Sequence, residues 1–325
     1  MTEQTGGAMP SRYKEADLSG LHRVSFEERG GLIDVGSFVT PGDPVPDIEG
    51  LMKVVPDLFA GSDFRRAVSA LARAAGEGRT VLVMFGAHVV KCGLSRLLID
   101  LMKRGVVSAV ATNGAGAIHD FEIAMWGRTS EDVAKHLEDG TFGMCSDTAD
   151  AMNGCASRGA AEGEGLGERL GRELVEKGAV NLDASIVGSA YELGIPATVH
   201  VALGTDIVHE HASADGAAIG ATSLRDFRIL SEVVSRLEGG VVVNIGSAVI
   251  LPEVFLKALA VARNLGGAAG AFTAIGLDMN EPYRAMLNVV GRPTAEHGMG
   301  IALRGRHEIL LPLLWAAVLA QLGRS

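Results

Sequence analysis

Histidine and acidic residues gather in two short stretches of the sequence, and their types suit proton transfer. In the first stretch, His119 and Asp120 directly follow a glycine-rich segment. The second stretch runs from His200 to Asp215 and holds three histidines among several acids. Histidine exchanges protons near neutral pH, so either stretch is a candidate centre for acid–base chemistry. We expect His119 to act beside a ligand, with His88 across the same crevice.

The second stretch also raises a metal hypothesis. His209 and His211 are two residues apart and would face the same way on an extended segment, with Asp206 as a third ligand. This spacing matches no established zinc pattern, so our leading interpretation has no metal. A metal-assisted hydrolase built on the His200–His211 cluster remains an alternative. These side chains could equally cap the following helix or meet a neighbouring subunit.

Buried-strand patterns alternate with helical patterns along the chain. Val81 to Phe85 is a continuous apolar run, which is typical of a strand covered on both faces. Leucines at helical spacing follow it, and Val106 to Ala111 gives a second run. The other predicted strands are 197–202, 240–245 and 268–275, and the other predicted helices are 64–75, 166–177 and 185–193. This alternation predicts an α/β fold with a doubly wound, mostly parallel sheet.

Glycine-containing turns follow three of the predicted strands. They contain Gly86 and Ala87, then Thr112, Asn113, Gly114 and Gly116, and then Gly246 and Ser247. Glycine lets the backbone approach a ligand closely, and open parallel sheets bind ligands at the carboxyl ends of their strands. We therefore expect a dinucleotide or nucleoside at these turns. Close packing of helices against the sheet would also favour small residues there.

Several segments resemble the deoxyhypusine synthase family. GAHVVKCG (86–93) and VVSAVATNGAGAIHDFE (106–122) are similar to the core of that family. The resemblance continues through ATVHVALGTDIVHEH (197–211), VVVNIGSAVILPEVF (241–255) and HEILLPLLWAAVLAQL (307–322). It covers roughly residues 60 to 322, and the order of the segments is more specific than any one of them.

The resemblance implies a Rossmann-like fold that binds NAD, and a homotetramer with sites at its interfaces. It suggests that the three glycine turns bind the cofactor together with Asp278. It places Asp206 near a Thr-Asp pair of the family, as a ligand for the substrate or the nicotinamide ribose. His88, His119, Asp120 and Asp206 are then the expected catalytic residues.

The chain also departs from the family pattern. The family's Ser-Asn pair falls on Ala87 and His88, and its paired glutamates fall on Ile118 and His119. The family's catalytic lysine has no counterpart, because Lys257 is the last lysine of the chain. We therefore expect an NAD-dependent transferase or oxidoreductase that acts on a small amine, amino acid or nucleoside rather than on a protein lysine. A non-catalytic small-molecule binder is the alternative.

Composition narrows the class of protein. The 325 residues are 47% hydrophobic and 21% charged, which permits a large core. A formal charge of -10 argues against nucleic acid and anionic membrane as partners. Cys92, Cys145 and Cys155 form no disulfide pattern and predict reduced thiols. With a polar start and no long apolar run, we expect a cytoplasmic protein.

The domain division is predicted from the same patterns. Residues 1–30 are polar and predict a flexible arm, and residues 31–325 predict one domain whose first strand is 32–39. Gly140 to Gly167 is rich in glycine, alanine and small polar residues, so we expect a long loop, either a lid or an insertion. The apolar stretch Ile309 to Leu319 and the arm would contribute to a tetramer interface.

Overall fold

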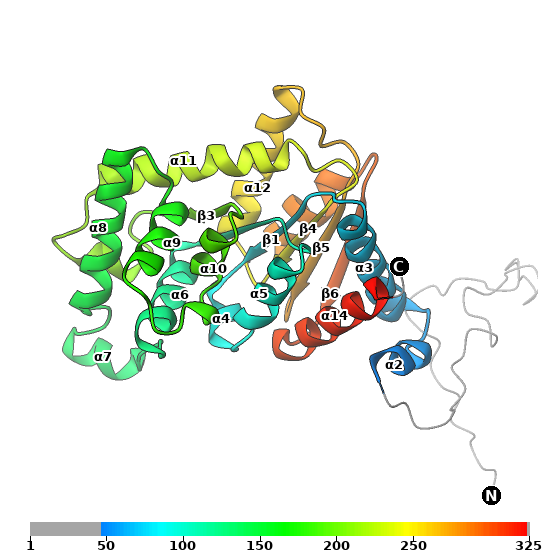
Figure 1. Cartoon of the computed structure of the whole chain (residues 1–325), viewed down its shortest axis with the longest axis horizontal. Helices are drawn as coiled ribbons and strands as arrows, with labels where there is room; N and C mark the ends of the chain where they lie inside the picture. Colours follow the sequence, from blue (N-terminus) through cyan, green and yellow to red (C-terminus); the bar gives the residue numbers. More distant parts are fainter. Residues whose placement is uncertain (1–46, 324–325) are drawn as a thin grey trace, which may run out of the picture. The chain divides into compact units, whose positions relative to one another are not determined.

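A single parallel sheet organises the part of the chain that the computed structural model describes, residues 47–323 (Figure 1). Its strands are β1 (Val81–Phe85), β2 (Ala109–Asn113), β3 (Ala197–His200), β4 (Val241–Ile245), β5 (Thr273–Asp278) and β6 (Met299–Arg304). They lie in the order β3-β2-β1-β4-β5-β6, and every neighbouring pair is parallel. The order reverses between β1 and β4, which makes that pair the switch point of a doubly wound sheet. The predicted α/β fold class is confirmed.

Helices connect the strands and cover both faces of the sheet. The α-helices are α2 (Ile48–Val54), α3 (Phe59–Gly76), α4 (Ala87–Lys91), α5 (Ser95–Lys103), α6 (Gly114–Trp126), α7 (Val133–Asp139), α8 (Ser146–Glu162), α9 (Leu166–Glu176), α10 (Ile186–Glu192), α11 (Gly216–Val234), α12 (Ile250–Asn264), α13 (Tyr283–Ala285) and α14 (His307–Leu322). Short 3-10 helices are η2 (Leu182–Ala184), η3 (Ile207–Glu210) and η5 (Arg292–Thr294), and η4 (Met286–Gly291) is a π-helix.

Alternate residues of the central strand β1 enter two different cores. Val83 and Phe85 belong to the cluster that contains buried residues of α3, α5 and α14. Leu82 and Met84 belong to a second cluster with residues of α11 and α12. Successive side chains of a strand point to opposite faces, so a fully apolar strand requires cover on both sides. This explains why the sequence of β1 is apolar throughout.

A third core lies beside the edge strand β3. It joins α6, α8, α9 and α10, and its buried residues include Phe121, Met152 and Leu170. These helices appear in green shades near one end of the sheet in Figure 1. The cluster fixes α6, the helix that follows β2.

The predicted loop from Gly140 to Gly167 is wrong, because α8 occupies most of it. Cys155 and Ala156 lie on the buried face of this helix, and Gly159 lies so close to α11 that a side-chain carbon there would meet Thr222 at 3.1 Å. The small residues therefore serve close helix packing. The helix ends at Gly163, whose φ of 75° is the left-handed conformation that glycine favours.

Most predicted elements are confirmed with shifted ends. The strand predicted at 106–111 begins and ends too early, because β2 spans Ala109–Asn113. The last predicted strand is also early, because β5 spans Thr273–Asp278. Sequence analysis missed β6 altogether; its burial is interrupted by exposed positions at the sheet edge. The predicted arm, the strand at 32–39 and the boundary at residue 31 lie outside the described residues.

The apolar stretch Ile309 to Leu319 forms part of α14. Leu311, Leu314 and Val318 are buried in the core of the same chain, whereas Ile309 is 58% exposed. Much of this apolar surface is therefore used within the subunit, and the tetramer stays a prediction. Within residues 47–323, no helix combines the length and the apolar character needed to cross a membrane.

Candidate functional site

A cavity of about 730 Å³ lies at the carboxyl ends of β1, β2 and β3. Lys91 reaches it from α4, His119 and Glu122 from α6, and Asp206 from the segment after β3. The segment after α6 adds Thr129, and α7 and the start of α8 supply further wall residues. This volume suits a small molecule, and the position is where α/β sheets bind ligands.

His119 is oriented in this cavity by a chain of hydrogen bonds. Its Nδ1 lies 2.6 Å from Oγ1 of Thr129, and the Thr129 hydroxyl donates to the carboxylate of Glu122. A hydroxyl has one proton, so the Thr129 oxygen can only accept from His119. Nδ1 must then carry the imidazole proton, and Nε2 keeps a lone pair. This is the tautomer of a base that a third group orients.

The surroundings of His119 favour its neutral form. Partial burial, and next the positive charge of Lys91, lower the pKa of His119, while Glu122 opposes the shift. Thr148 also donates to Glu122, at 3.0 Å, which holds that carboxylate in place. A neutral imidazole with a free Nε2 can accept a proton at neutral pH.

Charges of both signs line the cavity wall. Glu122, Glu131, Asp147 and Asp206 are acidic, whereas Lys91 and Arg128 are basic. His136 is paired with Glu131, its Nδ1 lying 2.6 Å from the Glu131 carboxylate. Acidic groups can bind an ammonium group, and Lys91 or Arg128 can bind a carboxylate. The wall is therefore suited to an amine or an amino acid.

Other atoms of the protein occupy the space beside the glycine-rich segment after β2. Asn113 accepts from Gly116 N–H at 2.8 Å and caps α6, and Thr112 donates to the Phe85 carbonyl at 2.9 Å. A side-chain carbon at Gly114 would meet Oδ2 of Asp206 at 1.8 Å, and one at Gly116 would meet Oγ1 of Thr112 at 2.0 Å. Packing within the protein therefore requires small residues at both positions, and the Asp206 carboxylate lies against the start of α6.

Asp120 lies away from the cavity and is fully buried. Its carboxylate accepts from the backbone N–H groups of Ile186 and Val187 at 2.7 and 3.2 Å and from the Ser185 hydroxyl. These groups form the first turn of α10, so Asp120 fixes α10 against α6. Burial raises its pKa to about 6 in spite of the three hydrogen bonds.

Asp206, His209 and His211 do not form a three-ligand metal group among the described residues. His209 and Asp206 make a reciprocal capping box at η3. His211 directs Nε2 at the Gly143 carbonyl, 2.9 Å away. His200 is buried beside Thr198, and burial lowers its pKa to about 3. These contacts agree with the alternative in which the side chains are structural caps. Asp206 also reaches the cavity wall, where burial raises its pKa.

The switch point between β1 and β4 carries two glycine turns in contact with each other. A side-chain carbon at Gly86 would meet the Gly246 carbonyl oxygen at 2.5 Å. Gly246 has a φ of 63°, and the ring of His307 lies over it, 2.8 Å from the position of such a carbon. Oδ1 of Asn244 and Nδ1 of His307 are buried beside these turns, and neither has a hydrogen-bond partner within residues 47–323. Ser247 is buried and accepts from the Leu251 N–H at 3.3 Å.

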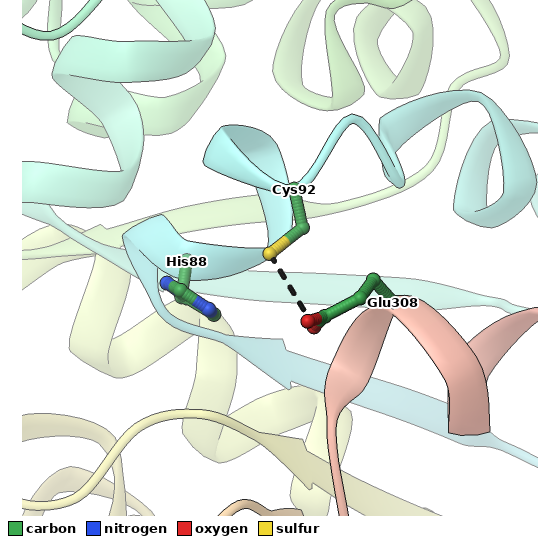
Figure 2. Close-up of side chains that lie close together, drawn as sticks. All are labelled: His88, Cys92 and Glu308. Carbon is green, nitrogen blue, oxygen red and sulfur yellow. Dashed lines mark hydrogen bonds between the residues drawn. The ribbon is translucent and has the colours of Figure 1, made fainter.

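Ala87 and His88 begin α4 directly after this switch point. His88 is not among the residues that line the cavity of His119. Its ring instead contacts that of His307, with centroids 5.3 Å apart, and lies beside Cys92 and Glu308 (Figure 2). Asp278 ends β5, and its Oδ1 accepts from Asn280 N–H at 3.2 Å.

Comparisons with known proteins identify the relatives of this chain. No family model matches. A deoxyhypusine synthase-like protein of Chlorobaculum parvum is 26% identical, and the match covers 69% of this chain and 72% of that protein. The structure of a proposed deoxyhypusine synthase from Entamoeba histolytica aligns with a TM-score of 0.50 and 13% identity, over 92% of this chain and 97% of the other. The chain is related to the deoxyhypusine synthase-like proteins.

Other solved structures share the fold of this chain. A proposed LOR/SDH protein from Methanococcus maripaludis S2 has a TM-score of 0.51 and 14% identity, over 97% of this chain and 75% of the other. AgrE in complex with ornithine and NAD+ has a TM-score of 0.51 and 16% identity, over 82% of this chain. This chain spans only 33% of the AgrE chain.

Sequence analysis missed several residues of the candidate site. Lys91 was not among the predicted site residues, yet it lines the cavity and its charge lowers the pKa of His119. Glu122 lies three residues after His119 on α6, and helical spacing alone could have paired them. Thr129 and His307 carried no such signal, because their positions depend on how distant segments meet.

Proposed function

We propose that the chain is an NAD-dependent enzyme that acts on a small amine or amino acid. The observation that carries this proposal is the strand order with its switch point between β1 and β4, where two glycine turns meet. Dinucleotides bind at such a switch point in doubly wound sheets. Oδ1 of Asn244, near the end of β4, has no partner in the described part of the chain and is an acceptor that a bound ligand could satisfy.

The residues present fit a dinucleotide at this edge of the sheet. Gly86, Ala87, Gly246 and Ser247 would lie along its backbone, and Asp278 at the end of β5 would accept hydrogen bonds from ribose hydroxyls. NAD supplies a hydride acceptor or donor when it is bound. The turn after β2 has a smaller part in this proposal than the sequence suggested, because Asp206 already occupies the start of α6.

The substrate would lie in the cavity over β2 and β3. An amino group would be held by the acids of the wall, and a carboxylate by Lys91 or Arg128. His119 would accept a proton from the substrate at Nε2, since Nδ1 is committed to Thr129. Lys91 lies on α4 at the cavity wall and would keep His119 neutral until that transfer.

The names of structural neighbours agree with this substrate class. AgrE has been solved with ornithine and NAD+, and a variant of it with L-arginine. Both molecules are amino acids with a second basic group. The alignment covers only a third of the AgrE chain, so the proposal for this site is argued from the geometry of this chain and not from AgrE.

The test is an activity screen with a substrate panel. The protein would be mixed with NAD and a set of amino acids and diamines, and formation of NADH or loss of substrate would be followed. His119→Ala should abolish turnover of any substrate found, whereas His297→Ala, at a 72% exposed side chain outside the cavity, should not. Turnover that survives His119→Ala would exclude His119 as the base.

A further inference from the structure

His88, Cys92 and Glu308 form a compact group beside the switch point (Figure 2). One potential ligand atom from each side chain lies within 4.8 Å of the other two, and no other such group occurs within residues 47–323. The group is separate from the cavity of His119, because none of its three members lines that cavity.

Two of the three side chains are presented by a single helical turn. Cys92 N–H donates to the His88 carbonyl at 2.9 Å, so the two residues are one turn apart and share a face of α4. Glu308 comes from the first turn of α14, and its carboxylate points toward the Cys92 sulfur in Figure 2. A histidine and a second ligand at this spacing on a helix are a recurrent arrangement in zinc sites.

We propose that His88, Cys92 and Glu308 bind a zinc ion. Thiolate and imidazole ligands favour zinc over calcium or magnesium, which prefer oxygen. Three protein ligands leave one tetrahedral position for water or substrate, as in catalytic zinc sites. This site is a different one from the histidine cluster after β3, and it does not depend on NAD binding.

The spacing of the ligand atoms fits this ion. Zinc bound to a thiolate and a carboxylate at ordinary bond lengths and a tetrahedral angle would separate sulfur from oxygen by about 3.6 Å. Sγ of Cys92 and Oε2 of Glu308 are 3.8 Å apart. Only small side-chain rotations are therefore needed to bring these two atoms to one ion, and the third ligand already lies within 4.8 Å of both.

The neighbouring histidine offers a second, independent observation. His307 is 1% exposed, its ring contacts that of His88, and its Nδ1 has no hydrogen-bond partner among the described residues. Buried polar nitrogens are nearly always paired, so this atom favours a bound group beside the His88 ring. His307 also contacts the backbone at Gly246, which fixes its position.

A reactive cysteine is the competing interpretation of the same three residues. A thiolate nucleophile requires positive neighbours that stabilise it. Lys91 and Arg306 lie near Cys92, but its thiol donates to the carboxylate of Glu308. A metal ion would replace the proton between these two groups and remove the repulsion between them when both are charged. The arrangement therefore suits an ion better than a nucleophile.

Metal titration tests the proposal. The full chain would be stripped with EDTA and titrated with zinc against a chromophoric chelator, and with cobalt(II) as a spectroscopic probe. We expect one equivalent of either metal, with a sulfur-to-cobalt charge-transfer band. Cys92→Ser should remove the band and weaken zinc binding at least about tenfold, since even changes beyond the ligands cost that much. Cys145→Ser, at an exposed cysteine outside the group, should leave both unchanged.

A second variant guards against misfolding. Glu308 is exposed, so Glu308→Gln should keep the fold, as circular dichroism can verify, and still weaken zinc binding. Equal zinc affinity in the parent protein, Cys92→Ser and Glu308→Gln would overturn the proposal, as would no zinc uptake by the parent protein. The titration needs no NAD, so its failure and a failure of the NAD proposal can be told apart.

Discussion

Nδ1 of His119 lies 2.6 Å from Oγ1 of Thr129, ten residues along the chain. The Thr129 hydroxyl proton is committed to Glu122, so this contact assigns the proton of the neutral imidazole to Nδ1. The free Nε2 is what makes His119 the candidate base of the cavity. Both the tautomer and the pKa of His119 can be measured without a known substrate.

The tautomer of His119 should depend on Thr129. Nitrogen-15 NMR of the histidine rings should show the Nδ1–H form for neutral His119, with its signal assigned by its loss in His119→Gln. Thr129→Val removes the hydroxyl at similar volume, so the Nε2–H form, which predominates in free histidine, should gain population. Thr294→Val, a buried threonine remote from the cavity, is a matched control. An Nε2–H form in the parent protein would contradict the assignment.

Removal of the charge of Lys91 should raise the pKa of His119. Burial is the larger cause of the lowered pKa and the positive charge of Lys91 the second, so Lys91→Met should recover part of the shift toward 6.5. NMR titration of the His119 ring measures it directly. Lys103→Met, on α5 outside the cavity, should leave the titration unchanged. A pKa that falls in Lys91→Met would show that the sign of this interaction is wrong.

The stability of the protein should decrease as pH rises through Asp226. Burial raises the pKa of this fully buried carboxyl to about 7, from 3.8. The folded state thus holds a proton that the unfolded state has lost between about pH 4 and pH 7, so the free energy of unfolding falls across this window. The total is on the order of 4 kcal/mol.

Asp226→Asn should flatten that dependence. Asp226 Oδ2 accepts from the N–H groups of Gly167 and Val199, and an asparagine oxygen can keep both bonds without a charge. Denaturant unfolding of both proteins at several pH values between 4 and 8 provides the comparison. If the slope is the same in Asp226→Asn, another group must titrate in this window.

Asp120→Ala should destabilise the fold. The substitution leaves the N–H groups of Ile186 and Val187 buried and unpaired, which costs about 1 to 3 kcal/mol for each group. Asp183→Ala, at an exposed aspartate of the neighbouring η2, is the control. Thermal unfolding measures the effect. Unchanged stability in Asp120→Ala would mean that the carboxylate is not what holds α10.

Much of the fold could be predicted from the sequence because β1, β2 and β4 are short apolar runs between helical patterns. Their buried positions leave a clear signal in the residue types. The edge strand β6 gives a weaker signal, because exposed residues interrupt its apolar pattern. The segment of α8 was misinterpreted because small residues that allow close helix packing have the same composition as a loop.

The candidate site was only partly predictable. Glycines after strands pointed to the edge of the sheet where the cavity lies, and His119 lines that cavity. The sequence could not show that Asp120 turns toward α10 while its neighbour His119 faces the cavity, since adjacent helical residues point in different directions. Nor could it bring Cys92 near Glu308, 216 residues away, because that contact depends on how α4 and α14 meet the sheet.

The proposed reaction depends on NAD binding at the switch point between β1 and β4. Calorimetric titration of the full chain with NAD measures this binding, alongside Asp278→Asn and the control Glu232→Gln, whose exposed side chain on α11 is paired with Arg236. We expect one NAD per chain, affinity about tenfold to a hundredfold weaker in Asp278→Asn, and no change in Glu232→Gln. Absence of NAD binding, or equal affinity in all three proteins, would contradict it.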